Sequence, residues 1–154
     1  MSIWYNHIRV HINMDALVHN YRLLSTKGSC VAPIIKSDAY GHGLREASGA
    51  LRQAGAQIMA AGTVAEAAVL KECVPQVDVI SLLGPVYGPD YRAVGEHDIV
   101  PFVSTTEQLL LLEEEGRRSG APIRVALKFD TGMSRLGFCA EEAGGVADTL
   151  DGLD

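Results

Sequence analysis

Short apolar runs alternate with helical patterns about five times along this chain, and this alternation restricts its possible folds more than any other feature. The runs are continuous rather than alternating in polarity, which is typical of strands buried on both faces. They occupy residues 30–36, 58–61, 77–83, 99–103 and 123–129. Strands separated by helices are joined in parallel by right-handed crossovers, so the sequence predicts an α/β fold built from βα units.

Capping residues mark the helices between these strands. Asn13 is a suitable cap for a helix that runs to about residue 25. Thr63 and Glu66 form a capping box ahead of a helix that ends near residue 73, and Ser104 and Glu107 form another ahead of a helix to about residue 118. Further helical patterns lie at residues 44–54, 88–95 and 141–150.

Two architectures are compatible with this order of elements: an open doubly wound sheet and part of a (β/α)8 barrel. Doubly wound nucleotide-binding folds carry a Gly-x-Gly-x-x-Gly turn after the first strand. Gly41 and Gly43 match its first half, but Glu46 stands at the third position, so a dinucleotide site is a weak interpretation. A complete barrel takes about 250 residues, so this chain is expected to be a smaller open sheet or an incomplete barrel. Residues 5–12 alternate in polarity and predict an extra, half-buried N-terminal strand.

The composition argues against several classes of function. The chain has 154 residues, a net charge of −6 and no long block of like charges, so we expect no nucleic-acid partner and no anionic membrane surface. Its apolar runs are far shorter than the ~20 residues of a membrane span. The N-terminus has no apolar stretch typical of a secretory signal, so a cytoplasmic location is expected. The 3 cysteines and 5 histidines show no metal-ligand spacing, which predicts no metal site and buried, reduced thiols.

Lys36 is a lone lysine at the end of the run 30–36. Reactive groups in parallel α/β folds gather at the carboxyl ends of strands. A lysine that leaves a buried strand can be desolvated, and its neutral amine is then a nucleophile or forms imines. Tyr40 and the turn Gly41-His42-Gly43 lead into a helix start, which is suited to holding a phosphate. A solvated lysine, a packing tyrosine and a turn histidine are the alternative interpretation.

A second polar cluster, residues 128–138, follows the predicted strand 123–129. Lys128 and Asp130 are two residues apart and project to the same side of an extended chain, where opposite charges can pair. Arg135 follows in a Gly-rich turn and offers a permanent cation. Parallel strands end at one edge of a sheet, so we expect both clusters there. A snorkelling Lys128, an Asp130 that caps a turn and a solvated Arg135 are the alternative.

Residues 35–43, Ile-Lys-Ser-Asp-Ala-Tyr-Gly-His-Gly, resemble the pyridoxal-phosphate signature of alanine racemases. Residues 128–138, Lys-Phe-Asp-Thr-Gly-Met-Ser-Arg-Leu-Gly-Phe, resemble the second signature of that family, and residues 9–21 resemble its opening. The resemblance spans essentially the whole chain, with small departures at residues 37, 38 and 134. It implies an α/β fold that is an incomplete (β/α)8 TIM-type barrel with an extra N-terminal strand.

The resemblance also implies roles for individual residues. Lys36 would form an imine with pyridoxal 5'-phosphate and act as the base on one face of the substrate. Tyr40 would contact the phosphate, and Arg135 would hydrogen-bond the pyridine nitrogen. Lys128, sometimes carbamylated in this family, would hold Arg135 in place.

Three further residues complete the predicted site. Leu83, at the end of its strand, would pack near the cofactor ring. Asp130 and His42 would support the two signatures in which they stand. No metal ion is expected.

The activity implied by the resemblance is interconversion of L- and D-alanine, which supplies D-alanine for cell-wall peptidoglycan. Residues 1–13 would form a strand that joins a C-terminal β domain, and residues 14–154 would form part of the barrel. The second base would be a tyrosine from that domain of a partner subunit in a homodimer. The chain is therefore expected to be an N-terminal fragment that is inactive alone. The alternatives are a racemase of another small amino acid and a non-catalytic pyridoxal-phosphate-binding barrel protein.

Overall fold

The computed structural model describes residues 9–28 and 30–153. The helices in this part are α1 (Met14–Ser25), α2 (Lys36–Gly41), α3 (Leu44–Gln53), α4 (Val64–Cys73), α5 (Gly88–Glu96), α6 (Thr106–Ser119) and α7 (Ala143–Asp151), with a 3-10 turn, η1, at Ala140–Glu142. The strands are β1 (Ile58–Ala61), β2 (Asp78–Ser81), β3 (Ile99–Val103) and β4 (Ala126–Leu127). No helix within these two ranges is long and apolar enough to cross a membrane.

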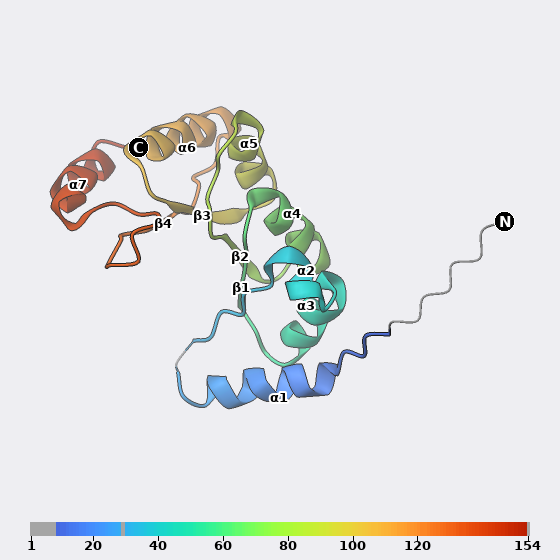
Figure 1. Cartoon of the computed structure of the whole chain (residues 1–154). Coiled ribbons are helices and arrows are strands. Elements are labelled where there is room, and N and C mark those ends of the chain that lie inside the picture. Colours follow the sequence, from blue (N-terminus) through green and yellow to red (C-terminus); the bar gives the residue numbers. More distant parts are fainter. Residues whose placement is uncertain (1–8, 29, 154) are drawn as a thin grey trace.

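The strands form a parallel sheet in which each strand pairs with the next one along the chain, in the order β1-β2-β3-β4. A parallel bridge between Ile34 and Ala60 adds the preceding segment to the β1 edge. A doubly wound sheet would reverse its strand order at a switch point, and this sheet does not. Helices α3, α4, α5 and α6 lie along one side of the curved row of strands (Figure 1). This is the arrangement of an incomplete (β/α)8 barrel of about five units, which decides between the two predicted architectures.

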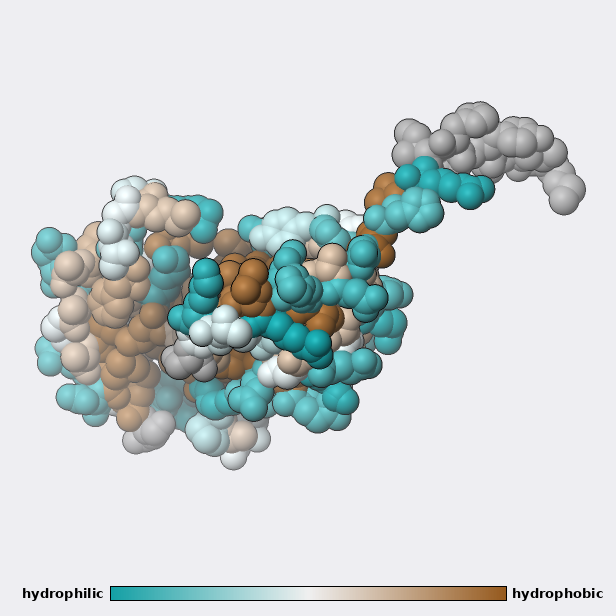
Figure 2. All heavy atoms as spheres, turned by 90° about the horizontal axis from the view of Figure 1, so that it is seen from below, coloured by the Kyte–Doolittle hydropathy of each residue, from teal (hydrophilic) through white to brown (hydrophobic). Residues whose placement is uncertain are grey.

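The core lies between the sheet and its helices. Met59, Val79 and Val103 on the strands are fully buried, as are Leu70 on α4 and Val94 on α5. Burial alternates along β2 and β3, because the helices cover only the outer face of the sheet. The prediction that the strands are buried on both faces is therefore wrong for these two strands. Apolar side chains also reach the surface over the C-terminal part of the molecule, as Figure 2 shows from below.

Several predicted strands are shorter in the structure. In residues 30–36, pairing is limited to the bridge at Ile34, whose side chain is 46% exposed, because in the described chain this segment has a partner on one side only. The strands predicted at 77–83 and 123–129 contract to β2 and β4. Of the predicted N-terminal strand, residues 5–8 lie outside the described part, and residues 9–12 have no strand pairing.

Helix caps agree closely with the sequence, with one exception. The Asn13 side chain accepts a hydrogen bond from the Ala16 backbone at 3.0 Å, and Thr63 and Glu66 form the predicted box. The cap of α6 is Thr105 rather than Ser104, so the box predicted with Glu107 is wrong by one residue. Gln108 takes the third helical position instead, where its side chain also donates 2.9 Å to the carbonyl of Pro85 and ties α6 to the loop after β2.

The cysteines are free thiols, as predicted, but they are not buried. Cys30 and Cys139 are exposed and Cys73 is partly buried. Cys30 and Cys139 lie in connecting segments, which run over the surface of a folded chain. The prediction of buried thiols is wrong for this reason.

An ion network ties the amino ends of the strands together. The Arg124 guanidinium, just before β4, lies 2.9 Å from Asp78 at the start of β2 and 3.1 Å from Asp98, just before β3. Lys71 of α4 lies 3.3 Å from the other oxygen of Asp98. Partial burial alone would raise the pKa of Asp98, but hydrogen bonds from Arg124 and Lys71 outweigh it and hold that pKa below its ordinary value. The network therefore stabilises the folded state when Asp98 is ionised.

Replacing Asp98 by Asn should lower the free energy of unfolding by about 1 kcal/mol or less at about pH 7, because partly exposed ion pairs are weak. Asn tolerates the positive φ of 49° at this position. The folded pKa lies below the unfolded value of about 3.9, so the contribution is present above that pH and is lost as the pH falls through the folded pKa. Urea unfolding at about pH 7 and pH 2 should show the gap between wild type and variant closing on acidification. A gap that widens would contradict this.

Candidate functional site

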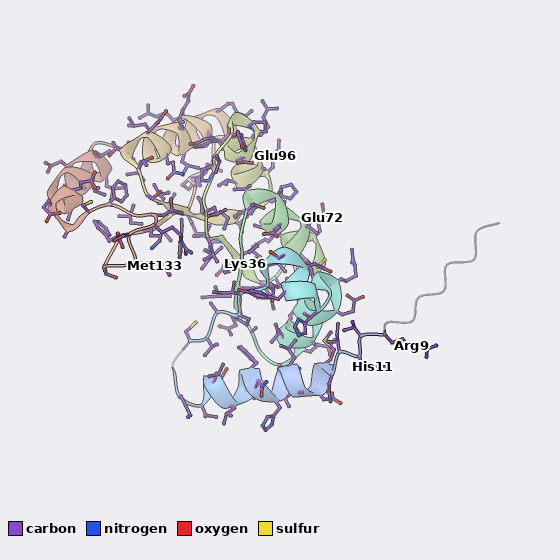
Figure 3. The ribbon with its side chains drawn as sticks, in the orientation of Figure 1. Arg9, His11, Lys36, Glu72, Glu96 and Met133 are labelled. Carbon is purple, nitrogen blue, oxygen red and sulfur yellow. The ribbon has the colours of Figure 1, made fainter. Side chains whose placement is uncertain are left out.

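The carboxyl ends of the strands meet at one edge, and most of the predicted site residues follow them. The Ile35 backbone, just before Lys36, donates 2.8 Å to the carbonyl of Ala60 in β1. The backbone of Leu83, after β2, donates 2.9 Å to Gly62, after β1, and that of Lys128, after β4, donates 2.8 Å to Val103. Figure 3 shows Lys36 beside the row of strands and Met133, in the second cluster, in the loop beyond β4.

The chain turns in a left-handed sense directly after Lys36. The four residues that follow, Ser37, Asp38, Ala39 and Tyr40, have φ angles of 52°, 54°, 55° and 56°. Lys36 is thus the first residue of α2 rather than the last residue of a strand. The turn brings the Lys36 Nζ to 5.9 Å from the centre of the Tyr40 ring. Lys36 is half-buried, whereas Tyr40 is 59% exposed.

Local hydrogen bonds hold this turn against the start of α3. The Asp38 carboxylate accepts from the backbone of Leu44 at 2.7 Å, and the Asp38 carbonyl accepts from Gly43 at 3.0 Å. The His42 Nδ1 lies 2.8 Å from the carbonyl oxygen of Ala39. A carbonyl can only accept, so this nitrogen carries the proton. His42 is thereby a turn histidine that supports the conformation around Tyr40.

Glu66 joins the Lys36 turn to the end of β1, a link that the sequence did not predict. One carboxylate oxygen accepts from the Ser37 backbone at 2.8 Å. The other accepts from the backbones of Gly62 at 2.9 Å and Thr63 at 3.2 Å. The sequence indicated only the capping box. The further signal was that the box begins directly after a strand that borders the Lys36 segment.

The second cluster is a closed loop organised by Asp130. Its carboxylate accepts from the backbones of Ser134 and Gly132, both at 3.0 Å, and these bonds hold the pKa of Asp130 below its ordinary value. The loop is closed where the Phe138 backbone donates 2.8 Å to Lys128 and the Asp130 backbone donates 2.9 Å to Phe138. Asp130 therefore caps a turn, and within the described residues it forms no salt bridge with Lys128.

Arg135 and Leu83 lie at the open side of this edge. The Arg135 side chain is exposed, and the part of the chain that the structure describes offers it no hydrogen bond or ion pair. Leu83 is 44% exposed and, with Leu136, lines a cavity of about 640 Å³ that extends from the loops after β2 and β3 along α5 and α6. The structure thus brings Lys36 and Tyr40 together, and among the described residues no hydrogen bond or ion pair joins Arg135 to the Lys36 turn.

The first cluster suits pyridoxal phosphate. An aldehyde needs a primary amine, and Lys36 supplies one at the strand edge. A phosphate needs donors and room, and the left-handed turn offers the Tyr40 phenol and a backbone with open space, since a Cβ built on Gly41 would meet nothing within 4 Å. Arg135 has a free guanidinium on the same edge. These residues therefore fit the aldehyde and the phosphate of pyridoxal phosphate.

The comparison with known families decides the classification. The family model described as alanine racemase, N-terminal domain, matches residues 12–154. The chain belongs to the alanine racemase family. Alanine racemases of two strains of Nitratidesulfovibrio vulgaris are 41% and 39% identical over 151 and 150 residues, each match covering 97% of this chain and 40% of the relative. The chain thus spans about two fifths of the length of these curated alanine racemases.

Solved structures agree with this classification. Alanine racemase from E. faecalis superposes with a TM-score of 0.82 at 28% identity, over 93% of this chain and 40% of that one. The alanine racemase of Bartonella henselae, whose structure has covalently bound pyridoxal phosphate, superposes with a TM-score of 0.80 at 26% identity, over 89% of this chain and 39% of that one. A histidine racemase from Leuconostoc mesenteroides has a TM-score of 0.81 at 26% identity, over 92% and 38%. The fold is therefore shared among racemases of different amino acids.

Gly137 is the position where the closed loop tolerates no side chain. A Cβ there would lie 2.6 Å from the Asp130 nitrogen and 2.8 Å from the Phe129 carbonyl carbon, and its φ is 128°. Gly132 offers a matched control, because its φ is 125° and a Cβ would meet nothing within 4 Å. The two glycines share backbone strain and differ in crowding.

Replacing Gly137 by Ala should lower the free energy of unfolding by about 1–3 kcal/mol more than replacing Gly132 by Ala, because only the first change forces backbone atoms apart. Urea unfolding of both variants measures the difference. Equal losses would mean that crowding at Gly137 does not matter and that the φ angle alone requires glycine.

Proposed function

We propose that the protein to which this chain belongs is a pyridoxal-phosphate-dependent alanine racemase that interconverts L- and D-alanine. One observation carries the proposal: the Lys36 amine stands beside Tyr40 at the carboxyl edge of the sheet. The family supports it, since a related alanine racemase structure has covalently bound pyridoxal phosphate. D-alanine for cell-wall peptidoglycan is the proposed product.

The proposed roles divide between the two clusters. Lys36 would hold the cofactor through its amine, and the same amine would move a proton at Cα on one face of the substrate. Tyr40 donates a hydrogen bond to the phosphate, and His42 keeps the turn in place through its bond to Ala39. When bound, pyridoxal 5'-phosphate withdraws electrons from the substrate Cα and so makes its proton removable.

The proposed role of the second cluster, residues 128–138, is to control the protonation of the cofactor's pyridine ring. Arg135 would donate a hydrogen bond to the pyridine nitrogen of the cofactor, and because its guanidinium keeps its protons at neutral pH, it would leave that nitrogen unprotonated. An unprotonated pyridine nitrogen would favour return of the proton to Cα over transamination. Lys128 and Asp130 hold the loop that carries Arg135, and Leu83 would pack near the cofactor ring from the loop after β2.

The remaining proposals concern the whole protein. Residues 1–13 form a strand that joins a C-terminal β domain, and residues 14–154 belong to the barrel. The second base is a tyrosine of a partner subunit in a cytoplasmic homodimer. The chain alone, with a base for one face of the substrate, is inactive.

Two alternatives concern the substrate and the presence of catalysis. The likeness to a histidine racemase at a TM-score of 0.81 favours, as a second candidate, a racemase of another amino acid. A non-catalytic pyridoxal-phosphate-binding barrel would not need a residue such as Arg135, so that residue argues against it. Incubation of the complete protein with L-alanine and other L-amino acids, followed by chiral analysis, separates the three cases.

Replacing Lys36 by Ala in the complete protein should abolish both covalent attachment of pyridoxal phosphate and formation of D-alanine, because the variant lacks the amine that attaches the cofactor and moves the proton. Borohydride trapping with peptide mass spectrometry and chiral chromatography measure the two losses. Lys27→Ala, which removes an exposed lysine after α1, is the control and should change neither. Racemisation that survives in Lys36→Ala would overturn the assignment.

A further inference from the structure

Glu66 makes more contacts than a helix cap requires. A capping box needs the Glu66 side chain to bond the backbone of Thr63, and the Thr63 side chain to accept from the backbone of Glu66, as it does at 3.1 Å. The same carboxylate also reaches the Gly62 backbone at 2.9 Å and, 29 residues back along the chain, the Ser37 backbone at 2.8 Å. Ser37 directly follows Lys36, so the carboxylate lies one peptide unit from the proposed cofactor-bearing residue.

This position requires a side chain whose two terminal atoms both accept hydrogen bonds. All three partners are backbone N–H donors, with Ser37 on one oxygen and Gly62 and Thr63 on the other. An amide of the same shape would have to point its own N–H groups at one of these sets of donors. Both oxygens of a carboxylate accept, and bonds to a charged acceptor are the stronger class.

Gly62 makes the close approach possible. A Cβ there would lie 2.8 Å from the Glu66 carboxylate and 3.4 Å from the Cβ of Lys36. The stem of Lys36 therefore passes over Gly62, with the Glu66 oxygens beside it. Gly62 and Glu66 together fix where the Lys36 side chain leaves the backbone.

We propose that Glu66 is a positioning residue for Lys36. By holding the Ser37 amide, it keeps the first residue of the left-handed turn in place and so sets the direction of the Lys36 side chain toward its carbonyl partner. This inference rests on the proposed function of Lys36. The step that it assists is condensation of the Lys36 amine with an aldehyde, in which a C=N bond forms and water leaves.

Three variants of the full chain separate positioning from capping. Glu66→Gln keeps the shape of the side chain and removes one acceptor. Gly62→Ala keeps the carboxylate and displaces it. Thr63→Ala is the matched control, because it removes the other half of the capping box and leaves the bond between Glu66 and Ser37 intact.

Two readouts are measured on each variant. The first is amide hydrogen exchange at Ser37 without cofactor, with protection in β2 and β3 as the test of folding. The second is the pyridoxal phosphate concentration that half-saturates Lys36, read from borohydride-trapped peptide. In Glu66→Gln and Gly62→Ala we expect Ser37 exchange and the half-saturating concentration each to rise about tenfold, as for one lost charged hydrogen bond. In Thr63→Ala both should stay within about twofold of the wild type.

The possible outcomes test the role of Glu66 separately from the proposed function of Lys36. If Glu66→Gln and Thr63→Ala raise both quantities equally, Glu66 acts only as a cap and the inference is wrong. Unchanged Ser37 exchange in Glu66→Gln, with β2 and β3 still protected, also overturns it. If pyridoxal phosphate never labels Lys36 in the wild type, the proposed function fails, while exchange at Ser37 still decides whether Glu66 holds the turn.

Discussion

Parallel pairing of each strand with its successor is the constraint on which the rest of this structure depends. Because no strand is skipped, every crossover helix falls on the same side, and every strand ends at the same edge. Residues far apart in the sequence, such as Lys36 and Lys128, therefore reach one edge without any direct interaction between them. The opposite edge serves stability, because Arg124, Asp78 and Asp98 tie the strand starts together there. The candidate site and this ion network thus lie at opposite ends of the strands.

The sequence predicted what short-range chemistry controls. Helix starts at Asn13 and Thr63 were found because a cap is a local exchange of hydrogen bonds between neighbouring residues. The cap of α6 was misplaced by one residue because Ser104 and Thr105 are both suitable caps. The observed cap at Thr105 is accompanied by a bond from the Gln108 side chain to the distant carbonyl of Pro85. Strand lengths were overestimated for a related reason, since an apolar segment forms a strand only where a neighbouring segment pairs with it.

The sequence predicted a set of candidate site residues but not how their side chains lie. The two signatures pointed to Lys36 and Arg135, but residue spacing carries no information on side-chain direction, and Arg135 is exposed in the structure. The sequence identified Glu66 only as part of a helix cap. Its bond to Ser37 spans 29 residues and depends on which segment borders β1, which only the sheet order reveals. One side chain thus contributes both to the start of a helix and to the edge where Lys36 stands.

The left-handed turn at residues 37–40 depends on contacts outside the turn, so its sequence alone does not transfer its conformation to another protein. L-residues in that conformation cost roughly 1–2 kcal/mol each, and none of these four is glycine. A synthetic peptide of residues 36–40 would relax to an ordinary conformation, because its Ser37 amide would bond water instead of Glu66 and its Asp38 carboxylate would lack the Leu44 amide. The surrounding fold imposes this conformation, so a graft onto another barrel must carry Glu66 of α4 and the start of α3 along with the lysine.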